Sequence, residues 1–196
     1  MICIKLFQND AAHNNVLIPE QALDTMHTAP HDPSLAGISK AHSDIIAHLF
    51  HLSGLGTHGP LSSEARQQAQ DTMAFFRRTV LAHHQAEERR LFPLVLAKAE
   101  PGDERAYVET LVGKLTAEHR QIETLWASLE SMLTAMLNGT SNTAIDTHIQ
   151  GLVLDYGDHA TEEESLFLPL CQEILRRSNP QFNEADLLHM PLPTSA

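Results

Sequence analysis

The sequence has few cysteines and few basic residues. Cys3 and Cys171 are the two cysteines among 196 residues, so neither a disulfide framework nor a thiolate zinc cluster is available. The 13 Lys and Arg residues stand against 25 Asp and Glu residues, which gives a formal net charge of −12. Because such a charge repels polyanions, the composition argues against nucleic acid and anionic membranes as partners, and it is compatible with metal cations.

Long apolar runs and strand patterns are also missing. No stretch approaches the roughly 20 consecutive apolar residues of a membrane span. The N-terminal segment MICIKLFQND lacks the apolar region and cleavage site of a signal peptide. No alternating run of strand length is found. We therefore expect a cytoplasmic, all-α protein with reduced thiols and a single folded domain.

The sequence does contain helical periodicity in four segments. In each, apolar residues recur every three or four positions, which is the spacing of one buried helix face. The turn-forming sequences SGLGTHGPLSS, EPGD and NG separate these segments. The pattern predicts an up-down-up-down four-helix bundle over residues 35–178, between an irregular N-terminal arm (1–34) and a C-terminal tail (179–196). Pro93 and Pro169 fall inside the helical pattern, so each should kink or fray its helix.

A pair of metal-ligand residues occurs twice in the sequence. His83 and Glu87 stand four residues apart in HHQAEERRLFP, and His159 and Glu163 stand four apart in HATEEESLFLP, 76 positions later. On a helix, residues i and i+4 project from one face, about 6 Å apart along the axis. An imidazole and a carboxylate placed in this way can bind one ion, or two ions that share the carboxylate. Two copies supply both halves of a dinuclear centre.

Two further histidines lie on apolar faces. His42 and His119 occupy positions in the first and third helical segments that should be apolar, 77 residues apart. With the two repeated pairs, this places four imidazoles and two carboxylates toward the bundle core. A buried ionised carboxylate without a partner costs several kcal/mol, and bound cations remove this cost. The repeat predicts a pseudo-two-fold axis that relates two equivalent half-sites.

The residues next to these faces are less clearly assigned. His84 and Glu88 have the same four-residue spacing, but they lie one position off the apolar face, and Ala160 replaces the histidine in the second copy. We therefore expect His84 to be solvated, and Glu88 either to be solvated or to hydrogen-bond to a ligand from outside. Glu123 follows His119 by four residues and is a further candidate metal ligand. Its place beside the apolar face leaves that role open.

Taken together, the motifs resemble the hemerythrin-like (HHE cation-binding) family. The resemblance runs from about residue 38 to residue 176 and rests on His42, on HxxxEExxLFP in the second helix, on EH in the third, and on HxxxEE with a downstream LFxP in the fourth. It implies a four-helix bundle that holds two non-haem iron ions bridged by Glu87 and Glu163; zinc or manganese would also suit these ligands. The terminal ligands that it implies are His42, His83, His119 and His159.

The sequence differs from the oxygen-carrying members of this family at one position, and the resemblance leaves two functions open. Oxygen-carrying hemerythrins have a second histidine where this sequence has Glu123, so a set richer in carboxylates is expected here, and reversible oxygen carriage is less favoured. The first function is binding or sensing a small oxidant (dioxygen, nitric oxide or peroxide), or simply holding iron. The alternative is a di-iron oxidase or peroxidase, or repair of iron centres. Both use the same ligands; the lack of a second catalytic constellation favours the first.

Overall fold

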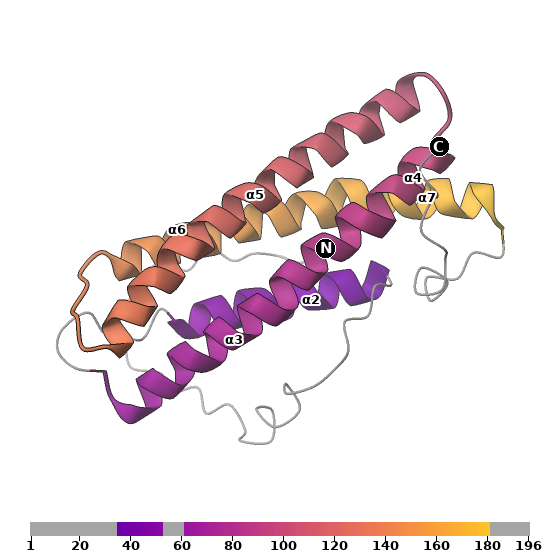
Figure 1. Cartoon of the computed structure of the whole chain (residues 1–196). Coiled ribbons are helices and arrows are strands. Elements are labelled where there is room, and N and C mark those ends of the chain that lie inside the picture. The colour runs from indigo at the N-terminus through magenta and orange to yellow at the C-terminus, as the bar shows by residue number, and fades with distance from the viewer. Residues whose placement is uncertain (1–34, 53–60, 181–196) are drawn as a thin grey trace, which may run out of the picture. The chain divides into compact units, whose positions relative to one another are not determined.

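The computed structural model describes residues 35–52 and 61–180, which form four helical rods and no strand (Figure 1). The predicted all-α bundle is therefore confirmed, whereas the predicted arm and nearly all of the predicted tail lie outside the described residues. Among the described helices, none is both long and apolar enough to cross a membrane. In chain order the rods are α2 (Leu35–Leu52); α3 (Ser63–Ala86), η1 (Glu87–Leu91) and α4 (Phe92–Lys98); α5 (Asp103–Leu137); and α6 (Ile145–Glu162), η2 (Glu163–Phe167) and α7 (Leu168–Ser178).

Local sequence explains where the rods begin and end. Ser62 caps α3, because its hydroxyl oxygen accepts a hydrogen bond from the backbone N–H of Ala65 at 3.1 Å. The predicted Asn-Gly stop ends α5: Gly139 has a φ of 90°, a conformation that glycine adopts without strain. The N–H of Thr140 then donates to the carbonyl of Ala135 at 3.0 Å and closes the helix end.

The buried side chains fall into two apolar clusters, one toward each end of the rods. Both α2 and α5 run from the second cluster to the first, while the rods that begin with α3 and α6 run from the first to the second. Neighbouring rods also pack in a ring, α2 on α3, α3 on α5, α5 on α6, and α6 on α2. This is the predicted up-down-up-down arrangement. Representative members are Ile45, Phe76, Trp126 and Leu152 in the first cluster, and Ile38, Val95, Leu115 and Cys171 in the second.

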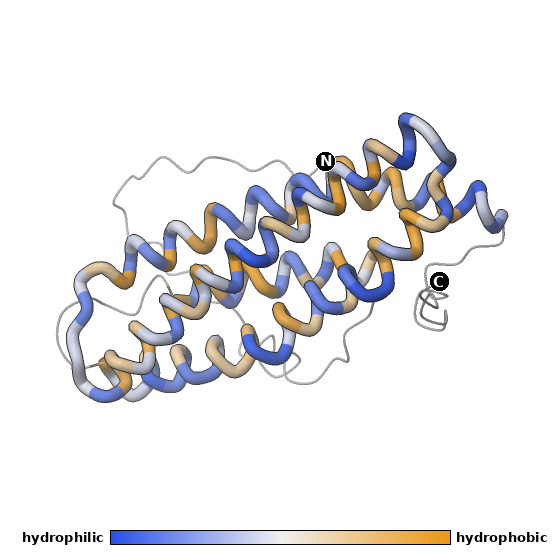
Figure 2. The backbone as a smooth tube through the Cα atoms, turned by 45° about the horizontal axis from the view of Figure 1, so that its top comes forward, coloured by the Kyte–Doolittle hydropathy of each residue, from blue (hydrophilic) through white to orange (hydrophobic). Residues whose placement is uncertain are grey.

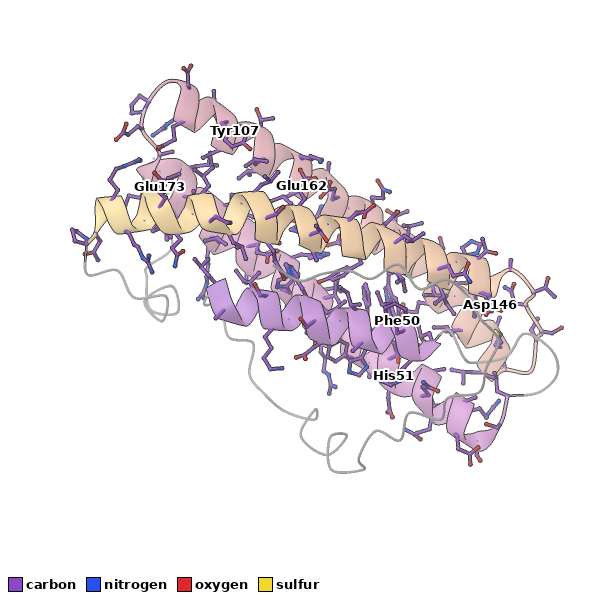
Figure 3. All side chains as sticks on the ribbon, turned by 180° about the vertical axis from the view of Figure 1, so that it is seen from behind. Phe50, His51, Tyr107, Asp146, Glu162 and Glu173 are labelled. Atoms are coloured by element: carbon purple, nitrogen blue, oxygen red, sulfur yellow. The ribbon has the colours of Figure 1, made fainter. Side chains whose placement is uncertain are left out.

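Apolar and polar residues are interspersed along the rods in the hydropathy colouring (Figure 2). The buried residues recur every three or four positions, for example along α2 and the middle of α5. Polar side chains such as Asp146, Glu162 and Glu173 project outward, and a few large apolar ones do the same (Figure 3). Phe50 is 59% exposed and Tyr107 is 49% exposed. Such scattered apolar residues are normal on a protein surface, and the main apolar surface lies between the rods.

A π-helical turn precedes each of the two prolines inside the rods. The turns begin at Glu87 and Glu163, 76 residues apart, so the sequence repeat is also a repeat of local structure. In the first copy the N–H of Phe92 donates to the carbonyl of Glu87, five residues earlier. Pro93 and Pro169 lack an N–H and crowd the carbonyl four residues before them, which disfavours regular α-helical bonding there. The predicted disturbance thus takes the form of one extra residue in a turn.

The extra residue changes which side chains are buried after each turn. In a regular helix, a step of three residues from Leu91 and from Phe167 would place Leu94 and Leu170 on the buried faces. The structure instead buries Val95 and Cys171 completely, and it leaves the two leucines partly exposed at the edge of the second cluster. Val95 and Cys171 are again 76 residues apart, so both copies shift by the same single position.

Candidate metal centre

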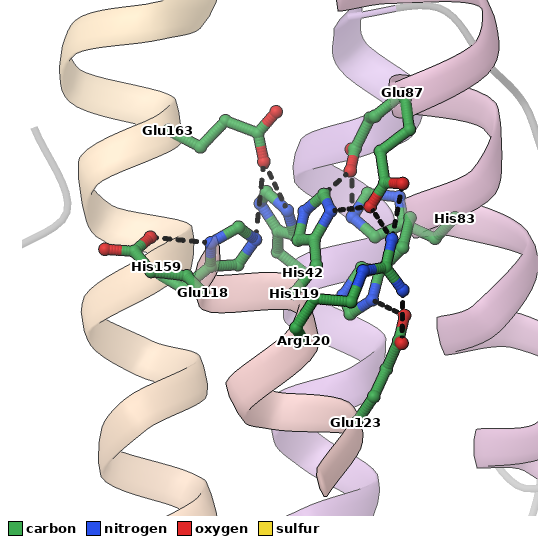
Figure 4. Close-up of polar contacts among 11 residues, drawn as sticks. His42, His83, Glu87, Glu118, His119, Arg120, Glu123, His159 and Glu163 are labelled. Atoms are coloured by element: carbon green, nitrogen blue, oxygen red, sulfur yellow. Dashed lines mark hydrogen bonds and ion pairs between the residues drawn. The ribbon is translucent and has the colours of Figure 1, made fainter. Parts of the chain in front are cut away.

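The two apolar clusters are separated by a layer of ionisable side chains. Figure 4 shows the polar contacts in and around this layer. Each member is at most 1% exposed, and every rod contributes at least one. Such a concentration of buried imidazoles and carboxylates is unfavourable unless the groups bind something. The layer consists of His42, His83, His84, Glu87, His119, His159 and Glu163.

The four histidines predicted from the repeat form two similar pairs. The rings of His42 and His83 lie 4.8 Å apart, and those of His119 and His159 lie 4.9 Å apart, both edge to face. One pair joins α2 to α3, and the other joins α5 to α6. Near-equal distances are what the predicted pseudo-two-fold axis requires of these two pairs.

Each buried glutamate lies between a histidine of one pair and a histidine of the other. Glu87 directs its two oxygens to different partners, with Oε1 3.1 Å from Nε2 of His83 and Oε2 3.4 Å from Nε2 of His119. A carboxylate placed in this way has the arrangement that a bridge between two ions requires. The corresponding distances from Oε2 of Glu163 to Nε2 are 3.2 Å for His42 and 3.7 Å for His159.

His84 belongs to the same layer, which corrects the expectation that it is solvated. It is completely buried, and its ring stacks on that of His119 at 3.9 Å with an angle of 6° between the planes. The ligand atoms fall into two groups, and within each group they lie within 4.8 Å of one another. Because Ala160 occupies the equivalent position in the second copy, the two half-sites are not equivalent. The three-histidine group is His84, His119 and His159; the mixed group is His42, His83, Glu87 and Glu163.

Glu123, the further candidate ligand, is placed outside both groups. Its Oε1 lies 3.1 Å from Nδ1 of His84, the ring nitrogen that faces away from the layer. The carboxylate is 23% exposed, unlike the fully buried Glu87 and Glu163. The structure therefore gives Glu123 the position of a hydrogen-bond partner behind an imidazole.

Four of the imidazoles have a carboxylate behind them in this way. A histidine whose Nδ1–H donates to a carboxylate presents the lone pair of Nε2 in the opposite direction, which fixes the ring for metal binding. Glu88 is one of these carboxylates, so it fulfils the second of the two roles expected for it. The Nδ1-to-carboxylate distances are 3.0 Å for His42–Glu164, 3.1 Å for His84–Glu123, 2.8 Å for His119–Glu88 and 3.1 Å for His159–Glu118.

The inward-facing atoms suit a bound metal. Nε2 of His84, His119 and His159 and both oxygens of Glu87 are buried. Although the Glu87 oxygens lie near imidazole nitrogens, none of these atoms makes a hydrogen bond of good geometry among the described residues. Each buried polar atom without a partner costs about 1–3 kcal/mol. Neutral imidazoles and carboxylates are a usual donor set for divalent first-row metals, so bound cations would satisfy all of these atoms together.

The metal-free layer has strongly shifted pKa values. Burial lowers the pKa of His42, but hydrogen bonds and charges from Glu163 and Glu164 outweigh it and raise the pKa to about 9. Burial, and then interactions with the neighbouring histidines and Arg120, hold the pKa of His84 and of His119 well below the usual range. Without metal, the layer therefore keeps one imidazole protonated and two neutral at pH 7.

Metal binding should release at least one proton per chain at pH 7, because a ligand nitrogen of His42 must first lose its proton. The apparent affinity of the mixed group should rise at least about tenfold per pH unit up to pH 9, because Glu87 of the same group, whose pKa burial raises well above its usual range, can add to the proton release. In the metal-free fold, the stability contributed by this raised pKa is fully present below pH 6.5 and is lost as pH rises through 9. Calorimetric zinc titrations in buffers with different ionisation enthalpies measure the proton release, and a value of zero would contradict this assignment.

The region that contains this layer matches the model of a known protein family. The family model named Hemerythrin, described as the hemerythrin HHE cation binding domain, matches residues 35–171. No curated protein and no solved structure gives a significant match. The matched residues include the whole layer and the carboxylates behind it.

Proposed function

Because this chain belongs to the hemerythrin family of HHE cation-binding domains, we propose that it binds two non-haem iron ions and uses them to bind or sense a small oxidant. Candidate oxidants are dioxygen, nitric oxide and peroxide. The observation that carries the proposal is the pair of adjacent ligand groups with Glu87 directed at both. When bound, iron would supply the change of oxidation state that these side chains lack.

The number of donor atoms supports two ions with room for a further ligand. Five imidazoles and two carboxylates offer nine nitrogen and oxygen atoms in the layer. Two six-coordinate ions have about twelve coordination positions. The remaining positions favour a small ligand over an organic substrate, because the apolar clusters enclose the layer on both sides.

Tyr156 also supports a small ligand with a hydrogen-bond acceptor. Its ring lies 6.0 Å from that of His42 and 5.9 Å from that of His159. The side chain is fully buried, and its hydroxyl has no hydrogen-bond partner among the described residues. A buried hydroxyl without a partner costs about 1–3 kcal/mol, which a bound acceptor would recover.

The placement of His84 changes the expectation about oxygen carriage. The sequence-based argument against reversible carriage treated Glu123 as a ligand in place of a histidine. With Glu123 behind His84, the donor set contains five imidazoles and two carboxylates, and that argument loses its premise. Reversible binding and sensing are therefore both compatible with the layer.

Reconstitution with ferrous iron tests the proposal. Protein purified without oxygen should take up about two iron ions per chain, and it should develop visible absorption when dioxygen or nitric oxide is added. Zinc-loaded protein is the control and should stay colourless, since zinc has no redox chemistry. An iron-loaded protein whose spectrum does not respond would contradict the proposal. Consumption of many equivalents of dioxygen or peroxide would favour the enzymatic alternative.

A further inference from the structure

A single guanidinium joins the two carboxylates behind the stacked imidazoles. Arg120 contacts Glu88 through Nη2 and Glu123 through Nη1 (Figure 4). Glu88 Oε1 lies 2.8 Å from Nδ1 of His119, and Glu123 Oε1 lies 3.1 Å from Nδ1 of His84. The outer nitrogens of both stacked rings are therefore connected through one arginine.

This connection addresses a problem that the stack creates. Two parallel rings 3.9 Å apart bring the carboxylates behind them close together, and two like charges at short range repel each other. A guanidinium places separate N–H groups toward two carboxylates, which offsets the repulsion and fixes their directions. If Glu88 or Glu123 moved away, its ring would lose the hydrogen bond that turns Nε2 toward the layer.

The third imidazole of the same group is held in a similar way. Glu118 lies 3.1 Å from Nδ1 of His159, and Lys114 lies 3.7 Å from Glu118. In the mixed group, His42 is backed by Glu164, and within residues 35–52 and 61–180 no Lys or Arg pairs with that glutamate. The cation-supported carboxylates are thus concentrated behind the three-histidine group.

We propose that Arg120 is a positioning residue for the three-histidine group, and that it organises one of the two metal positions and not the other. This inference rests on the proposed metal-binding function, because it concerns how that centre is assembled. The Arg120 side chain is 54% exposed, so water screens its ion pairs and its effect on overall stability is small. Its effect is exerted on the orientation of His84 and His119.

Arg120→Gln should weaken binding of one metal ion by about 10–100-fold, the usual effect of removing a group that orients a ligand. The other ion should bind within about twofold of its wild-type affinity. Arg120→Lys should recover part of the loss, because it restores the charge without the planar fork. Arg77→Gln is the matched control. Arg77 is 60% exposed, and its Nε lies 2.7 Å from Oε1 of Glu130, a pair that is not part of the layer. Zinc titration calorimetry measures both affinities in each variant.

Two results would overturn the inference. Arg120→Gln could bind both ions with the affinities of Arg77→Gln, or its affinity for both ions could fall by the same factor. A second measurement needs no metal. In metal-free wild-type protein, ring ¹⁵N chemical shifts of His84 and His119 should show the proton on Nδ1, and Arg120→Gln should give mixed tautomers with an unchanged melting temperature. If wild-type protein binds no metal, the proposed function fails, while unaltered tautomers in Arg120→Gln would refute the role of Arg120 alone.

Discussion

Removing the metal should lower the melting temperature of this protein by about 15–30 °C. Each ion present at about a thousand times its dissociation constant contributes about 4 kcal/mol. Two ions give about 8 kcal/mol, and a chain of this size loses about 2–4 °C per kcal/mol. The physical reason is that the ligands come from all four rods, and without metal their buried atoms face one another without hydrogen-bond partners, as at His84 and Glu87.

Scanning calorimetry of chelator-treated and zinc-reloaded protein measures this difference. Magnesium is the control cation, because it prefers sites made of oxygen ligands and should restore little of the stability. Identical unfolding curves for rigorously metal-free and zinc-loaded protein would show that the layer does not bind metal in the folded state.

His84→Ala should abolish binding of one of the two metal ions, with at least about a 100-fold loss of affinity, and leave the other in place. His84 supplies one of three imidazoles in its group, so its removal leaves that ion two protein nitrogens. His83→Ala should remove the ion of the mixed group instead, although the two residues are adjacent in sequence. Metal analysis after gel filtration, together with zinc titration, distinguishes these outcomes.

His51→Ala is the control for this pair, because His51 is exposed at the end of α2 (Figure 3). It should bind both ions with wild-type affinity. Retention of both ions by His84→Ala would mean that His84 is buried for packing alone. The four histidines predicted from the repeat would then form the complete imidazole set.

Sequence periodicity predicted four of the five imidazoles, and the reason for missing His84 is geometric. A single 3.6-residue stripe selects one position per turn, and adjacent residues differ by about 100° around the helix axis. In a bundle each rod contacts two neighbours, so α3 packs on both α2 and α5 and has a wide buried face. His83 points toward His42 on α2, while His84 points toward His119 on α5. The adjacent HH pair, with Glu123 four residues after His119, was the available signal.

The fold was predictable because every rod has a clear apolar face and a strong stop signal. Which residues are buried after the repeated motif was not predictable. Steps of three and four residues describe a regular helix and a helix with one extra residue almost equally well. Leu94 and Leu170 therefore fitted the pattern, although the π-helical turns move Val95 and Cys171 into the core. The two prolines indicated that the helices are irregular there. That the irregularity is a π-helical turn can be seen only from the backbone hydrogen bonds in the structure.

We expect the polar layer also to affect how the protein unfolds. It divides the apolar core into two clusters that do not merge, so in the metal-free state each cluster can open with its own free energy. Amide hydrogens at the two ends of the rods would then exchange with solvent as separate units. Ions bound to all four rods would couple these units, because opening either end would strain ligands that the other end holds. Metal occupancy would thereby convert two local unfolding transitions into a single cooperative one.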